Sequence, residues 1–181
     1  MIQRIDLAPL LKEAVATPYS DLVTRPTGAF VRGRIEKAIV GSAHRATQLD
    51  FTAVGLLDMS CADEVVAKLL LWVTGEEEER YVVLSGVTDA HLDAIDSVLE
   101  RHGLTIAAFP AGGGMPRLLG ATTPDVLHAF QAVHRLGPGD AGRLADILGW
   151  TVERAADALQ SLALRRLIQA AGGTFRPLAP A

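Results

Sequence analysis

The chain has 181 residues, of which 49% are apolar and 21% are charged, and it carries a formal net charge of −4 at pH 7. This length suits one large or two small domains with real hydrophobic cores. The acidic balance excludes a protein that coats nucleic acid or an anionic membrane surface.

A single cysteine, Cys61, excludes an internal disulfide and is typical of a reducing cytoplasm. The first residues lack the basic region and long apolar run of a signal peptide. The longest apolar run, residues 65–73, is interrupted by Lys68 and is too short to cross a bilayer. We therefore expect a cytoplasmic protein with no membrane partner.

The first 110 residues alternate between helical and strand-like patterns. Apolar spacing predicts helices over residues 5–15, 29–40, 62–73 and 89–102. Strand-like patterns predict strands over residues 46–51, 81–87 and 104–109. Thr17-Pro18 is expected to end the first helix, and residues 25–28 are expected to form a turn. Strands that alternate with helices predict parallel pairing with right-handed crossovers.

Residues 110–116 contain three glycines and two prolines, which indicates a linker of about 110–121 between two domains, 1–120 and 122–181. The second domain is predicted to contain helices over residues 124–136, 140–148 and 151–164. Two short strands, residues 167–170 and 174–178, flank Ala171-Gly172-Gly173, which is a hairpin signal.

The first domain resembles the STAS domain of anti-sigma-factor antagonists, and in particular a STAS-like family with an Asp-Phe…Val…Ser…Ala-Asp-Glu pattern. Here the pattern reads Asp50-Phe51-Thr52-Ala53-Val54 and then Ser60-Cys61-Ala62-Asp63-Glu64. The segments 24–28, 82–87 and 99–104 fit the same family, so the resemblance covers roughly residues 20–110. It implies an α/β domain with a mixed or parallel sheet and helices.

The resemblance also implies a site at the helix that follows the central strand. In STAS antagonists a serine at the start of this helix is phosphorylated by a partner kinase, and by position that serine is Ser60, with Asp58 before it. Met59 and Cys61 stand where the family has a serine and a glycine. Ser60, Asp58 and Asp63 are therefore the candidate residues for phosphorylation or contact with a protein partner.

The residues themselves leave alternatives open at this site. Ser60 followed by Asp63 is a capping pattern, so Ser60 is either a helix cap or a phosphoacceptor at a helix N-terminus. Asp50 and Asp58 either accept backbone amides in the turn or contact a partner. Cys61 is either a small buried residue or a redox-sensitive thiol.

The second domain is similar to winged-helix DNA-binding domains. Residues 145–155 resemble the helix-turn-helix core, and residues 158–168 resemble the recognition helix leading into the wing. The resemblance implies a winged-helix (α+β) fold with an exposed recognition helix. The candidate DNA contacts are Arg143, Arg154, Gln160, Arg165, Arg166 and Arg176. Because Glu153 and Asp157 share the expected exposed face, dimerisation or protein contact stays an alternative.

The chain shows no nucleophile–base pair, cofactor loop or metal-ligand spacing, so we expect neither an enzyme nor a cofactor or metal. The five histidines lack helical ligand spacing and are expected mostly at the surface or its boundary. We expect a transcription-related regulator whose STAS-like domain binds a protein partner and whose winged helix binds DNA. The alternative is an adaptor that binds only proteins, with a homodimer formed through the winged helix.

Overall fold

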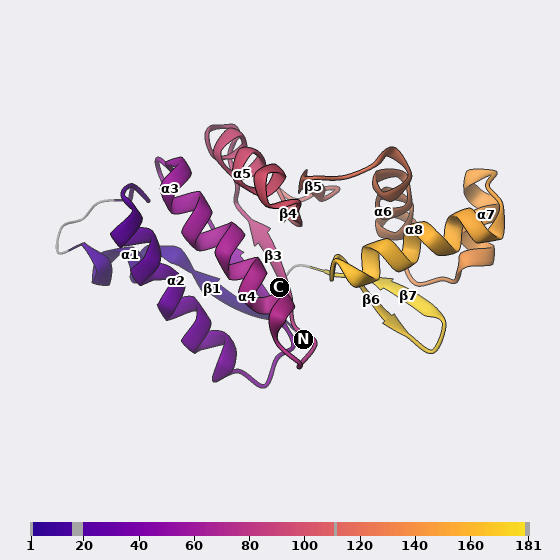
Figure 1. Cartoon of the computed structure of the whole chain (residues 1–181), viewed down its shortest axis with the longest axis horizontal. Coiled ribbons are helices and arrows are strands. Elements are labelled where there is room, and N and C mark those ends of the chain that lie inside the picture. Colours follow the sequence, from indigo (N-terminus) through magenta and orange to yellow (C-terminus); the bar gives the residue numbers. More distant parts are fainter. Residues whose placement is uncertain (1, 16–19, 111, 180–181) are drawn as a thin grey trace. The chain divides into compact units, whose positions relative to one another are not determined.

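The computed structural model describes residues 2–15, 20–110 and 112–179. The chain forms two compact units, the first extending to Ala121 and the second running from Thr122 to Ala179. They are coloured indigo to pink and brown to yellow in Figure 1.

The first unit contains a mixed five-stranded sheet whose strands follow one another in chain order. The strands are β1 (Ile2–Asp6), β2 (Ala46–Asp50), β3 (Tyr81–Ser85), β4 (Thr105–Phe109) and β5 (Arg117–Gly120). Strands β1 to β4 are parallel, and β5 pairs antiparallel with β4. The predicted α/β class with a mixed or parallel sheet is confirmed at this level.

The helices of the first unit form one layer over one face of this sheet (Figure 1). They are α1 (Leu7–Ala14), α2 (Arg25–Val40), α3 (Met59–Ala62), the π-helical stretch η1 (Asp63–Lys68), α4 (Leu69–Gly75) and α5 (Asp89–His102). Neighbouring parallel strands joined by crossovers of the same hand carry their helices on the same face, which explains the arrangement. α3, η1 and α4 follow without a break and form one helical rod.

Strand register separates two chemically different sheet faces. One row across β1 to β4 is apolar and belongs to the hydrophobic core under the helices: Ile5, Leu49, Leu84 and Ala108. Side chains alternate along a strand, so the adjacent positions face away from the helices. Those positions include the polar residues Arg4, Gln48, Asp50 and Ser85.

Most expected elements of the first unit are confirmed, and three are wrong. Residues 2–6 form a strand, so the first helix begins at Leu7 and not at Ile5. Residues 25–28 form the first turn of α2 because Pro26 fits the start of a helix. Residues 117–120, assigned to the linker, pair with β4. The expected stop at Thr17-Pro18 lies outside the described residues.

The second unit contains three helices followed by a hairpin. Its elements are α6 (Pro124–Leu136), α7 (Ala141–Leu148), α8 (Val152–Leu164), β6 (Ile168–Ala171) and β7 (Thr174–Pro177). The three predicted helices and the hairpin are confirmed. An antiparallel bridge between Gly139 and Phe175 ties the segment before α7 to the hairpin. In the described part of the chain, no helix is long and apolar enough to cross a membrane.

Candidate functional site

The helix that follows β2 begins at a carboxylate that collects several hydrogen bonds. Asp58 is the N-cap of α3, and its Oδ1 accepts the Cys61 backbone N–H at 2.7 Å and the Ser60 hydroxyl at 2.8 Å. Its Oδ2 accepts the backbone N–H of Thr24 at 3.1 Å. Partial burial opposes ionisation of Asp58, but the backbone bonds from Cys61 and Thr24 outweigh it and lower the pKa of this carboxyl.

This geometry corrects the sequence interpretation of Ser60 as the helix cap. Ser60 lies inside the first turn, and Asp58, two residues earlier, accepts the backbone amide. A bridge between Leu22 and Leu57 holds the chain just before Asp58, which places its carboxylate ahead of the helix. The capping box of Ser60 with Asp63 does not form, because the N-cap is Asp58 and not Ser60.

Large exposed apolar side chains surround this helix start. Leu56 is 62% exposed, Met59 44% and Val23 37%. The backbone N–H of Leu22 donates to Leu56 O and that of Asp58 donates to Leu22 O, so the two segments lie side by side. We call Val23, Leu56 and Met59, together with the half-buried Ser60, the helix-start surface.

The third predicted site residue, Asp63, lies inside the helix layer. Its carboxylate accepts Arg25 Nη1 at 2.9 Å and lies 2.9 Å from His102 Nε2. Burial raises the pKa of Asp63, and the hydrogen bonds from Arg25 and His102 reverse this, so the pKa lies below the ordinary value. Asp63 therefore joins α2, η1 and α5 and is not part of the helix-start surface.

Next to it, the buried Glu64 is the centre of an ion network that the sequence did not reveal. Its carboxylate accepts Arg25 Nη1 at 2.8 Å, Arg32 Nε at 3.2 Å and Lys68 Nζ. Burial opposes ionisation, but the hydrogen bonds from Lys68, Arg25 and Arg32 lower the pKa of Glu64. We call Arg25, Arg32, Asp63, Glu64 and Lys68 the ion network.

Close packing of α2 against this region depends on Gly28. A Cβ at this position would lie 3.0 Å from both Cys61 Cα and Glu64 Cβ, so a larger residue would push the helices apart. The Cys61 thiol contacts the carbonyl of Thr24 at 2.9 Å. Burial, with the charge of Asp58, raises the pKa of Cys61 to about 12. A thiol with this pKa stays protonated at neutral pH, so the buried interpretation of Cys61 is supported over redox sensing.

His91 is buried, in contrast to the surface position expected for most histidines. Its Nδ1 accepts the backbone N–H of Thr88 at 3.2 Å, and its Nε2 lies 2.6 Å from the carbonyl oxygen of Gly55. With Nδ1 as the acceptor, Nε2 is the ring nitrogen that donates to the Gly55 carbonyl. His91 thereby links the start of α5 to the loop that carries Leu56.

The structure brings the predicted DNA contacts of the second unit into different surroundings. Arg154 donates from Nε and Nη2 to the two carboxylate oxygens of Asp125, at 2.8 and 2.6 Å, and stacks over Trp150 with 4.3 Å to the ring centroid. The guanidinium of Arg143 donates to Pro138 O at 3.0 Å. Thus the one arginine of α8 is paired with a carboxylate of α6, although its side chain keeps 50% exposure to solvent.

The other candidates are distributed over the helix and the hairpin. Gln160 on α8 and Arg176 on β7 are exposed, and Arg165 and Arg166, just after α8, are half-buried. On α8 itself, the exposed positions are Val152, Glu153, Arg154, Asp157, Gln160 and Leu164.

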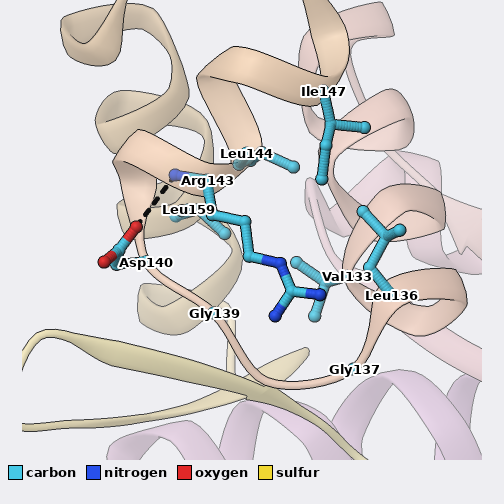
Figure 2. A pocket seen from close by; sticks show the side chains of 9 residues that line it. All are labelled: Val133, Leu136, Gly137, Gly139, Asp140, Arg143, Leu144, Ile147 and Leu159. Carbon is cyan, nitrogen blue, oxygen red and sulfur yellow. Dashed lines mark hydrogen bonds between the residues drawn. The ribbon is translucent and has the colours of Figure 1, made fainter.

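A small hollow between α6, α7 and α8 has mostly apolar walls (Figure 2). Val133, Leu136 and Ile147 surround it, and Arg143 lies along its edge. Its volume of about 20 Å³ is close to that of one water molecule, so it does not fit an organic ligand. It marks imperfect packing of the helices.

No group of three or more histidine, cysteine, aspartate or glutamate side chains in residues 2–15, 20–110 and 112–179 is arranged to hold a metal ion. No protein-family model, curated protein or solved structure matches the chain.

Proposed function

We propose that the chain is a regulatory protein that binds a protein partner through the helix-start surface of its first unit. The observation that carries this proposal is the cluster of Val23, Leu56 and Met59 around the start of α3. Large exposed apolar side chains gathered at one place are typical of protein–protein contacts. The hydrogen bonds of Asp58 hold the surface rigid, which reduces the entropy lost when a partner binds.

In this proposal the second unit is a winged helix. The order α6, the bridged segment at Gly139, α7, α8 and the β6–β7 hairpin is the order expected for that fold, with α8 as the recognition helix. The geometry supports protein contact through α8 better than DNA reading. Its exposed face carries Val152, Leu164 and two carboxylates, while Arg154 is bound to Asp125.

DNA binding stays the second candidate because exposed polar groups flank α8. In this second candidate, Arg143 on α7 and Arg176 in the hairpin would contact phosphates, and Gln160 is of a type that reads adenine. With so few cations, the affinity would be modest and its dependence on salt shallow.

The partner surface is tested by site-specific photo-crosslinking in cells of the source organism. A photoreactive residue replaces Met59 in one variant and Leu71 in the matched control, which is 45% exposed but lies on α4. We expect a discrete crosslinked species from position 59 that is absent at position 71 and is lost when Leu56→Asp is added. Equal crosslinking at both positions would contradict the proposed surface.

The role of the second unit is tested by fluorescence anisotropy with a labelled mixed-sequence duplex at low and physiological salt. Protein contact through α8 predicts no saturable binding at either salt concentration. Salt-sensitive binding that weakens in Arg143→Ala with Arg176→Ala, but not in Arg34→Ala on α2, would instead make the second unit a DNA-binding domain.

A further inference from the structure

A pocket of about 300 Å³ opens at the carboxyl ends of strands β1 to β4, on the sheet face opposite the helices. Its lining includes Arg4, Asp50, Thr52, Ser85, Phe109 and Gly114. Parallel sheets bind ligands beyond the carboxyl ends of their strands, and this volume is within the range of small-molecule sites. The pocket is separate from the helix-start surface, so its role does not depend on the proposed function.

One residue that lines the pocket is an arginine held in place by a buried carboxylate. Asp50 is 3% exposed, and its Oδ2 accepts Arg4 Nε at 3.0 Å and also Arg4 Nη2. Its Oδ1 accepts the backbone N–H of Thr52 at 3.0 Å and the Thr52 hydroxyl at 2.6 Å. Burial opposes ionisation, but the bonds from Thr52 and Arg4 lower the pKa of Asp50, so the carboxylate is charged at neutral pH.

A tight turn maintains this arrangement. Gly86 has φ of 67°, and a Cβ there would lie 2.3 Å from Thr52 Oγ1 and 2.6 Å from Thr52 N. Only glycine allows the end of β3 to pass this close to Thr52. The contact fixes Thr52 against Asp50 and, through Asp50, the orientation of Arg4.

Hydrogen-bond donors remain for a ligand. Asp50 engages the Nε side of the Arg4 guanidinium, which leaves the Nη1–Nη2 edge, and the Arg4 side chain is 60% exposed. This edge offers two parallel N–H groups that match the two oxygens of a carboxylate. The Ser85 hydroxyl accepts Gln48 Nε2 at 2.8 Å, and its own hydrogen has only a long contact of 3.5 Å to Leu49 O, so it can donate to a ligand.

The charges favour a monoanion over a phosphate dianion. Asp50 pairs with Arg4 and the charge of Asp6 also acts on it, so a dianion meets more repulsion in the pocket than a monocarboxylate does. The aromatic ring of Phe109, which is 7% exposed, and Pro110 supply an apolar wall on the β4 side. A ligand that satisfies both features has a carboxylate at one end and an apolar body at the other.

We propose that this pocket binds a small carboxylic acid, with its carboxylate on the Nη1–Nη2 edge of Arg4 and the Ser85 hydroxyl, and its apolar part against Phe109 and Pro110. The site makes the first unit a receptor for a small organic acid. Binding involves no covalent step, and the ligand enters as the carboxylate.

The proposal is tested by titrating the full chain with benzoate. Binding is measured by isothermal titration calorimetry and by backbone amide NMR. Benzamide has the same shape without the charge, and inorganic phosphate has charge without the apolar body. We expect saturable benzoate binding that shifts the amide signals of Gly86, Gly113 and Gly114, with benzamide and phosphate binding at least about tenfold more weakly. Absence of saturable benzoate binding, equal binding of benzamide, or shifts confined to other residues would each overturn it.

Variants distinguish binding by the two parallel N–H groups of Arg4 from binding by its positive charge alone. Arg4→Lys keeps a cation beside Asp50 but removes the two parallel N–H groups, and we expect about tenfold weaker benzoate binding. Arg34→Lys, on an exposed ion pair with Glu13, is the matched control and should bind like the wild type. Ser85→Ala removes the second donor without touching the ion pair, and we expect several-fold weaker binding. Unchanged benzoate affinity in both Arg4→Lys and Ser85→Ala would refute the assignment of the site. If Arg4→Lys does not fold, unchanged affinity in Ser85→Ala is sufficient to refute it.

Discussion

Replacing Glu64 by glutamine isolates the contribution of the ion network to stability. The Glu64 side chain is 4% exposed and contacts three cations, whereas those cations are more exposed, at 53% for Arg25, 39% for Lys68 and 27% for Arg32. Glutamine preserves the volume and some hydrogen bonds but removes the carboxylate that the three cations share. Arg25 and Lys68 keep Asp63 as a partner, and Arg32 keeps Glu36.

The cost follows from how much of that charge water can screen. Removing one partner of a fully buried pair costs about 3–5 kcal/mol, and exposed pairs contribute about 0–1 kcal/mol. Because the three cations keep access to water, we expect Glu64→Gln to destabilise the first unit by about 1–3 kcal/mol. The matched control is Glu13→Gln, which removes an acid from an exposed pair with Arg34 and should cost much less.

The difference in stability between Glu64→Gln and Glu13→Gln is measured by urea unfolding monitored through tryptophan fluorescence. The chain has two tryptophans, and a Trp150→Phe background leaves Trp72 on α4 to report on the first unit alone. If Glu64→Gln shifts the unfolding midpoint no more than Glu13→Gln does, the network is effectively solvated and the argument is refuted.

Glu64→Gln should also change how the stability of the protein depends on pH. The folded-state pKa values of Asp63 and Glu64 are lowered, so their stabilising contribution is complete above their unfolded values near 3.8 and 4.5 and is lost as the pH falls through the lower folded values. We expect the stability of the wild type to fall with acidification below about pH 5, and that of Glu64→Gln to fall less steeply. An identical pH dependence in the two proteins would contradict the assigned ion pairs.

Three further substitutions test individual contacts. Asp58→Ala removes the cap of α3 and should cost about 1–2 kcal/mol in urea unfolding, whereas Ser60→Ala should cost less; the reverse order would restore Ser60 as the cap. Gly86→Ala forces a left-handed backbone onto alanine and overlaps Thr52, so we expect a loss of roughly 2–4 kcal/mol by the same assay, and a change near zero would show that the turn can relax. Arg154→Ala should lower the thermal midpoint of the second unit slightly and leave duplex anisotropy unchanged, while a large loss of DNA affinity would show that this arginine reaches DNA.

Local signals located most of the regular structure. The strand-like segments at 46–50, 81–85 and 105–109 form the buried parallel strands, and the helix over 89–102 lies between Thr88 and Gly103 as expected. The strands at 81–85 and 105–109 were predictable because burial on both faces favours mainly apolar residues, and the end of the helix because a left-handed glycine stops it locally.

The candidate sites depended on contacts between distant residues. Ser60 and Asp58 are both good caps by residue type, and only the bridge of Leu22 with Leu57 placed Asp58 in front of the helix. Arg154 pairs with Asp125, which lies 29 positions away in the sequence. The helical pattern of α8 alone does not show this partner, so Arg154 was predicted to contact DNA.

The sequence by itself determined most of the helical segments and the three central strands, since these depend on propensities and patterns within a few residues. The tertiary structure alone decided the strand at 2–6, the burial of Asp63, Glu64 and His91, and the meeting of Arg4 with Asp50. Each of these features requires partners about 30 to 50 positions away in the sequence. The conformation and burial of a short polar segment therefore depend on the groups that the fold packs against it.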